Sequence, residues 1–86
     1  MRRPLRISID TGLPGGAAYV RYSTSKAVRQ DALDDDFSVA VDLDAIGEVV
    51  GVELTLLDRR AFELLAEAGR KYDLEIPDLR GLGAAS

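Results

Sequence analysis

Three carboxylates in the middle of the chain have the spacing of a calcium-binding loop. Counted from Asp42, acidic side chains occupy positions one, three and twelve (Asp42, Asp44 and Glu53), and glycine occupies position six. An EF-hand loop places ligands and its invariant glycine at these positions. Position five, which normally supplies another oxygen, is Ile46 and has no donor atom. The three residues are therefore at most weak candidates for a divalent-cation site, and we expect no bound metal.

The segments on both sides of this loop alternate between apolar and polar residues. That pattern indicates strands, whereas an EF-hand loop lies between helices. A β-hairpin with an even loop, residues 45–48, makes every pair on one face apolar, whereas a three-residue loop would oppose Asp44 to Glu48. We therefore predict the even loop, with Asp42, Asp44 and Glu53 on the opposite face of the sheet. The predicted apolar pairs are Leu43 with Val50, Val41 with Val52, Val39 with Leu54 and Phe37 with Leu56.

The sequence lacks several residue types and motifs on which common enzyme mechanisms depend. The chain contains no histidine and no cysteine, which excludes Ser-His-Asp triads, cysteine nucleophiles and histidine-ligated zinc. The stretch TGLPGG (Thr11–Gly16) has neither the G-x-G-x-x-G spacing nor that of a P-loop, and we interpret it as a turn. A small sheet also offers no deep cleft for a pair of catalytic carboxylates. We expect no enzymatic activity and no cofactor.

The net charge of −4 is unevenly distributed along the chain. The first six residues include three arginines, whereas residues 31–48 hold seven acidic side chains and no basic one. Nucleic-acid binding is disfavoured, because its affinity comes mainly from cationic contacts to phosphate. The acidic segment suits a basic protein partner instead, as in a regulator that neutralises a toxin-like protein.

The N-terminal sequence predicts a cytoplasmic protein. No apolar run approaches the roughly 20 residues that span a bilayer, so we expect no contact with a membrane. The two arginines near the start are not followed by an apolar region, which a signal peptide requires. The lack of cysteine is compatible with a reducing compartment.

Apolar periodicity predicts a single small domain, residues 1–86, of the α+β class. Residues 5–57 alternate with period two between turn signals, which indicates four to five strands. Short connections favour an antiparallel β-meander. Residues 59–72 change to a helical period, with Asp58 as N-cap and an apolar stripe through Phe62, Leu65 and Tyr72. We expect this C-terminal amphipathic helix to pack on the sheet and an apolar tail, residues 73–86, to follow it.

The small core motivates a prediction of self-association. One helix of 14 residues is only about 21 Å long and covers part of such a sheet, and a chain of this size buries a limited fraction of its surface. We therefore predict a homodimer and a non-enzymatic protein-interaction module. The tail supplies the candidate interface residues Leu74, Ile76, Leu79 and Leu82.

Two segments carry a resemblance to a known family. The stretches AAYVRYS (Ala17–Ser23) and VDLDAIGEVVGVEL (Val41–Leu54) resemble the pattern of the DUF2283 family of small bacterial proteins of unknown function. That family usually has Asp or Asn where this chain has Ile46, and an acidic segment where this chain has LPGG. The resemblance covers about half of the chain. It implies a compact β-rich domain and no particular activity.

Overall fold

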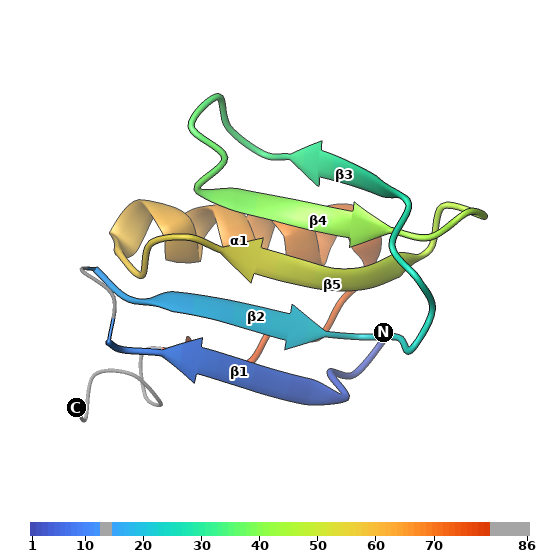
Figure 1. The fold of residues 1–86 in the computed structure, drawn as a ribbon, viewed down its shortest axis with the longest axis horizontal. Helices are drawn as coiled ribbons and strands as arrows, with labels where there is room; N and C mark the ends of the chain where they lie inside the picture. Colours follow the sequence, from blue (N-terminus) through green and yellow to red (C-terminus); the bar gives the residue numbers. More distant parts are fainter. Residues whose placement is uncertain (13–14, 80–86) are drawn as a thin grey trace.

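The computed structural model describes residues 1–12 and 15–79, which form an antiparallel sheet of five strands with one helix packed on it (Figure 1). The strands are β1 (Arg6–Asp10), β2 (Ala17–Arg21), β3 (Arg29–Ala32), β4 (Val39–Leu43) and β5 (Val49–Leu54). The helix, α1, has the predicted bounds Arg59–Tyr72, and the side chain of its N-cap Asp58 accepts the Ala61 N–H at 2.8 Å. The α+β class, with the sheet preceding the helix, is confirmed.

The order of strands across the sheet is β1-β2-β5-β4-β3, so the meander is interrupted once. Strands β3, β4 and β5 follow one another as neighbours, but β2 pairs with β5 and not with β3. Composition explains this order. The apolar strand β5 (VVGVEL) suits the centre of the sheet, whereas the short charged strand β3 (RQDA) suits an edge.

The β4–β5 hairpin contains two of the predicted apolar pairs, Val41 with Val52 and Val39 with Leu54. The predicted pairing of Phe37 is wrong, because β4 begins only at Val39. Phe37 lies in the preceding turn with φ 55°, and its side chain is 55 % exposed.

The turn of this hairpin also differs from the prediction. The Asp44 N–H donates to the Glu48 carbonyl oxygen at 2.9 Å, so the loop has three residues, 45–47, and ends at Gly47 with φ 86°. This loop type is common in hairpins. A β-bulge after it pairs Leu43 with Val49 and restores the apolar register further along. The extra residue of the bulge thus removes the mismatch that made a three-residue loop look unfavourable.

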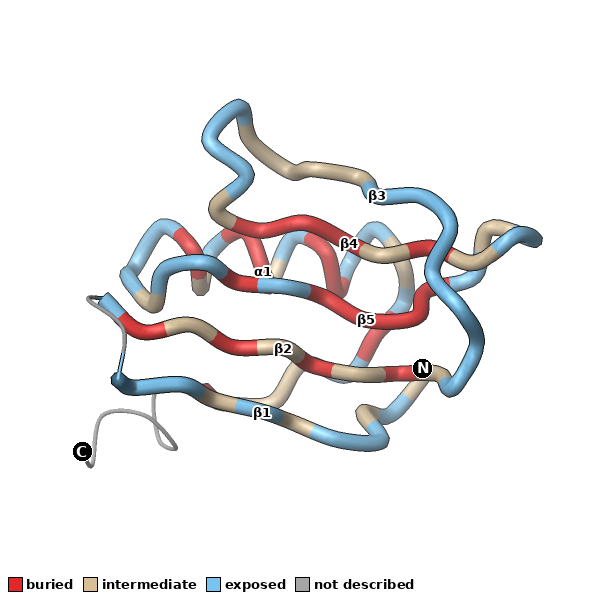
Figure 2. The backbone as a smooth tube through the Cα atoms, in the orientation of Figure 1, coloured by how far each residue is buried: buried red, intermediate tan, exposed pale blue. Residues whose placement is uncertain are grey.

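Burial is concentrated in the three central strands and the inner side of α1 (Figure 2). The helix packs against β4 and β5. Its buried residues are Ala61, Leu64, Leu65, Ala68 and Gly69, whereas the predicted stripe through Phe62 and Tyr72 is only partly buried. The helix is therefore rotated from the predicted orientation, so that Leu64 and two alanines are buried in place of Phe62 and Tyr72.

The chain after α1 folds back on the domain instead of offering an apolar interface. Leu74 and Leu79 are 3 % and 2 % exposed and belong to the core of the protomer, and Ile76 packs against that core. A side chain at Gly69 would meet the Ile76 Cγ1 at 2.5 Å, so glycine at this position permits the return. The prediction that Leu74 and Leu79 face a partner is wrong for this reason, and Leu82 lies outside the described residues.

The basic N-terminus is also bound to the domain. The Arg2 guanidinium donates to the carbonyl oxygens of Val49 and Tyr22, each at 2.8 Å. Its backbone N–H donates to the Asp73 carbonyl oxygen, and its own carbonyl accepts from Glu75. Arg2 thus joins the β5 bulge, the end of β2 and the segment after α1. In the described part of the chain, α1 is too short and too polar to cross a membrane, and no other helix could do so.

Candidate functional site

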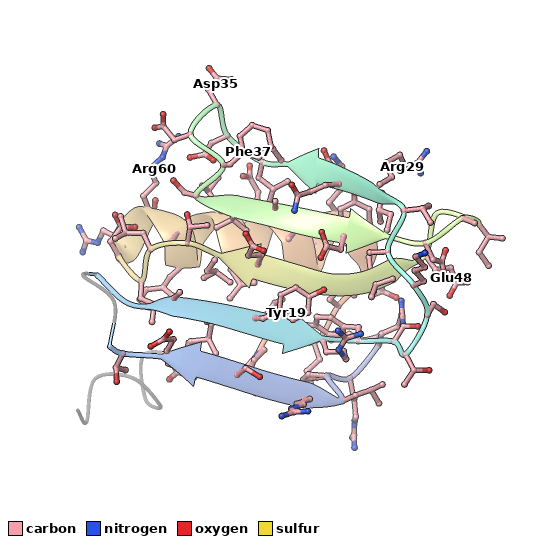
Figure 3. All side chains as sticks on the ribbon, viewed as in Figure 1. Tyr19, Arg29, Asp35, Phe37, Glu48 and Arg60 are labelled. Carbon is pink, nitrogen blue, oxygen red and sulfur yellow. The ribbon has the colours of Figure 1, made fainter. Side chains whose placement is uncertain are left out.

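The face of the sheet opposite α1 carries the polar side chains of the strands, and Tyr19 lies near its centre (Figure 3). A Cβ added to Gly51 would come within 2.3 Å of the Tyr19 ring, so the ring lies directly over this glycine of β5. The phenol then reaches across β5 and donates to Asp42 Oδ2 on β4 at 2.8 Å. Gln30 Nε2 on β3 donates to the other oxygen of this carboxylate at 3.0 Å. The three side chains form a fixed polar bridge across four strands.

Tyr19 is held as a protonated phenol. Burial, the hydrogen bond to Asp42 and the charge of that carboxylate raise the pKa of Tyr19 to about 12. The Arg21 guanidinium lies 5.5 Å from the ring centroid and opposes this shift weakly. At neutral pH the phenol therefore donates a hydrogen bond and cannot act as a general base. The arrangement provides a rigid aromatic platform.

Beside this platform the sheet surface forms a shallow open hollow of about 400 Å³. Its floor is largely apolar and its rim carries two exposed carboxylates, Asp10 and Glu53. Glu53 is directly opposite Tyr19 in the β2–β5 register. The lining residues are Ser8, Ile9, Asp10, Ala17, Ala18, Tyr19, Glu53, Leu54 and Thr55. A side chain with an apolar stem and a positively charged end matches this surface.

The three carboxylates of the calcium-like spacing have separate roles. Asp42 accepts from Tyr19 and Gln30, whereas Asp44 turns into its own hairpin and accepts the N–H groups of Ile46 and Glu48. Only Asp42 and Glu53 share the open face, and they come from different strands. The described residues contain no group of three or more acidic side chains that could hold a metal ion. The prediction that Asp44 shares a face with the other two is wrong, because its carboxylate is hydrogen-bonded to backbone N–H groups of the turn.

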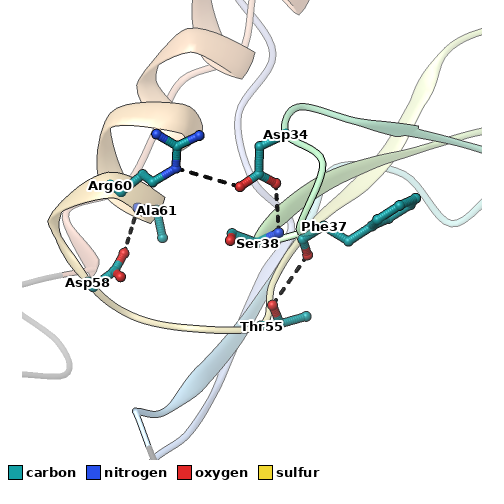
Figure 4. A network of polar contacts seen from close by, with 7 residues as sticks. All are labelled: Asp34, Phe37, Ser38, Thr55, Asp58, Arg60 and Ala61. Atoms are coloured by element: carbon teal, nitrogen blue, oxygen red, sulfur yellow. Dashed lines mark hydrogen bonds and ion pairs between the residues drawn. The ribbon is translucent and has the colours of Figure 1, made fainter.

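The turn between β3 and β4 is anchored to the start of α1 and the end of β5 (Figure 4). Asp34 is almost fully enclosed, accepts the Ser38 N–H at 2.8 Å and lies 3.6 Å from Arg60. Burial raises its pKa, but the Ser38 hydrogen bonds and Arg60 outweigh this and hold the pKa below its usual value. The Thr55 hydroxyl donates to the Phe37 carbonyl oxygen at 3.3 Å. These contacts fix the turn and leave the Phe37 ring outside.

The acidic segment, residues 31–48, does not form one patch. Asp31 binds Lys71 at 2.9 Å and accepts from the Tyr72 hydroxyl; these hydrogen bonds lower its pKa. With Asp34, Asp42 and Asp44 also in internal contacts, the remaining exposed carboxylates are Asp35, Asp36 and Glu48. Asp35 precedes β4 and Glu48 follows it, so they lie beyond opposite ends of that strand (Figure 3). Most of the acidic charge of this segment thus stabilises the fold.

No protein-family model matches the sequence, and the searches of curated proteins and of solved structures give no match. The resemblance to the DUF2283 family therefore stays a prediction. Gly51, which lies under the Tyr19 ring at the centre of the open face, was not singled out from the sequence. A glycine inside an otherwise apolar strand was the available signal, since such a glycine often marks a close approach by another group.

Proposed function

We propose that this protein is a non-enzymatic protein-interaction module and that it binds a partner through the open face of its sheet. The observation that carries the proposal is the Tyr19 platform. The ring is seated on Gly51 and bound to Asp42, and it borders a hollow with an apolar floor. Fixed aromatic side chains with a polar tip are enriched in protein interfaces, because they supply contact area at low entropic cost.

The hollow favours a partner segment that presents a lysine or arginine together with apolar surface. The apolar stem of such a side chain would lie on Ala17 beside the Tyr19 ring, and its charge would meet the Glu53 carboxylate. Arg21, one of the cations already on this face, lies over the Tyr19 ring and donates to the Ser23 carbonyl oxygen. We therefore expect the predicted basic partner to bind at the open face and not at the acidic segment, residues 31–48.

The state of the ionisable groups supports a binding role over catalysis. Tyr19 and Tyr22, each with a pKa raised to about 12 mainly by burial, are proton donors that do not ionise near neutral pH. The pKa values of Asp31 and Asp34 are lowered by their structural partners. A general acid or base instead needs a pKa near the working pH. The hollow is also open, and a partner could dissociate from it readily.

The proposal is tested by selecting binders from a random peptide library displayed on phage against the folded protein. We expect enriched peptides to contain a basic residue next to an apolar one. In ¹H–¹⁵N NMR spectra, a synthetic copy of such a peptide should shift the amides of β1, β2 and β5 around the hollow. Glu53→Lys should weaken binding at least tenfold, because it replaces attraction by repulsion at the rim.

Glu63→Lys is the matched control, since it makes the same charge change on the exposed side of α1. It should leave the affinity within twofold of the wild type. Enrichment of acidic peptides, a failure to enrich any sequence, or shifts confined to α1 would each refute the proposal. Equal losses of affinity in both variants would show that only the net charge matters, which also contradicts it.

A further inference from the structure

Strand β1 lies at the edge of the sheet and pairs only with β2. Among residues 1–12 and 15–79, no strand lies along its outer side. An unpaired edge presents a row of backbone donors and acceptors that another strand can bind, and proteins usually protect such edges. The sequence of β1 decides what this edge can accept.

The five residues of β1, RISID, are complementary to themselves in antiparallel register. When two copies are aligned about Ser8, Arg6 of each copy faces Asp10 of the other, and Ile7 faces Ile9. The register with β2 fixes the sides. Ile7 and Ile9 pair with the buried residues Val20 and Ala18 on the helix side, so Arg6, Ser8 and Asp10 belong to the open face.

We propose that two copies of this protein associate through β1 in antiparallel register about Ser8, which joins the two sheets into one of ten strands. Cross-strand pairs of opposite charge and of β-branched residues are both stabilising. The pairing contains two Arg6–Asp10 pairs on the open face and two Ile7–Ile9 pairs on the helix side. It goes beyond the proposed partner binding and does not depend on it.

The burial of β1 supports this pairing. Val20, Val41 and Val52 on the three central strands are 0 % exposed, whereas Ile7 and Ile9 pack against the core and are only partly buried. The cause is the position of α1, which covers β4 and β5 and leaves β1 beyond its reach (Figure 1). A second β1 would cover the exposed parts of both isoleucines.

The opposite edge, β3, is protected against such pairing. It has four residues, and its Asp31 points toward the helix side, where it binds Lys71. Alignment of two β3 strands about Gln30, which keeps each pair on one face, would place Arg29 against Asp31. Asp31 is already bound to Lys71 and Tyr72, however, and residues 29–31 contribute no apolar pair. Pairing of β1 with β3 would place the isoleucines against Arg29 and Asp31. The complementary contact is thus between identical edges, and it closes at a dimer instead of continuing into fibres.

The interface is small. Five residues of strand span about 17 Å, which is below the size of a standard stable interface, so we expect a dissociation constant in the micromolar range. The pairing would also bring Arg6 of the second copy to Asp10 on the rim of the hollow. Glu53 would then be the carboxylate of the hollow that stays available to a partner. A substitution of Glu53 therefore tests partner binding more directly than a substitution of Asp10.

Sedimentation velocity of the full chain between about 1 and 500 µM tests the proposal with a charge exchange. Arg6→Asp alone places two aspartates against each other at both pairs, and Asp10→Arg alone places two arginines against each other. Each single variant should dimerise at least tenfold more weakly than the wild type. An equimolar mixture of the two should form heterodimers, because its arginines again face aspartates, and Arg6→Asp/Asp10→Arg should dimerise like the wild type.

Arg29→Asp, the same charge change on the other edge, should leave dimerisation unchanged, and circular dichroism should show that every variant is folded. A wild type that stays monomeric at 500 µM would overturn the proposal. Dimers that are insensitive to both single substitutions would also overturn it and would place self-association on another surface. If the single substitutions weaken dimers but the mixture restores nothing, the Ser8-centred register is wrong. None of these results bears on peptide binding at Glu53, which is measured separately.

Discussion

Replacement of Gly51 by alanine tests the seat of the Tyr19 ring. The backbone at Gly51 has an ordinary negative φ, so an alanine there is not strained by conformation. The nearest obstacle is the Tyr19 side chain, whose atoms a new Cβ would meet at 2.3–2.4 Å. In Gly51→Ala the ring must leave β5, and the hydrogen bond to Asp42 must break with it.

The expected free-energy change has two opposing parts. The hydrogen bond to the partly buried Asp42 carboxylate is worth about 1–1.5 kcal/mol, and the ring contact with β5 adds about 0.5–1 kcal/mol. Alanine in place of a strand glycine returns about 0.5–1 kcal/mol. Gly51→Ala should therefore destabilise the wild type by about 0.5–2 kcal/mol. In a Tyr19→Ala background the same substitution should stabilise by about 0.5–1 kcal/mol.

Urea denaturation of the wild type, the two single variants and the double variant measures this reversal of sign as a coupling energy of about 2 kcal/mol. Absorbance of tyrosinate gives an independent readout, and the chain has three tyrosines and no tryptophan to interfere. In Gly51→Ala the pKa of Tyr19 should fall from about 12 toward its ordinary value near 10. If Gly51→Ala stabilises both backgrounds equally, or if the titration is unchanged, the ring is not seated on this glycine.

Three further predictions concern the rest of the fold. Arg2→Ala should lower the free energy of unfolding by about 2–4 kcal/mol, because two backbone carbonyls lose a charged donor. Arg2→Lys cannot donate to both carbonyls in the same way, and its loss of unfolding free energy should be about half as large. Denaturant titrations measure both values. Leu79→Ala should cost about 2–4 kcal/mol by opening a cavity in the core, whereas Ile46→Ala, at a side chain 81 % exposed, should cost less than about 0.5 kcal/mol; equal costs would contradict the assignment of Leu79 to the core. Stability should fall as the pH rises from about 10 to about 12, because unfolded tyrosines ionise near 10 while folded Tyr19 and Tyr22 keep their protons until about 12; thermal melts across this range check it, and a flat melting temperature would contradict it.

Local patterns in the sequence determined the elements of this fold. Alternation of apolar residues predicted β4 and β5, and the change to a helical period after Asp58 predicted α1 with its observed bounds. These patterns are readable because each reflects the burial of one side of a single element. The alternating flanks of Asp42 and Asp44 were enough to favour a hairpin over an EF-hand loop.

Only the tertiary structure decided how the elements combine. The place of β3 at the far edge depends on which strands compete for the centre of the sheet, and alternation within one strand does not specify its neighbour. The three-residue turn at 45–47 keeps the apolar register only because a bulge pairs Leu43 with Val49. The prediction of a four-residue loop counted residues on the assumption that the strands contain no bulge.

The candidate site shows the same division. Composition revealed the carboxylates, but each acquired its role from groups distant in sequence. Tyr19 and Asp42 are 23 residues apart, and their bond requires the bare backbone of Gly51 between them. The complementarity of RISID can be read in the sequence, whereas the sheet order is what leaves β1 unpaired at an edge. Residue types and periods thus set the elements, and pairing between distant segments decided which surfaces remain available, because burial of one group depends on every neighbour that covers it.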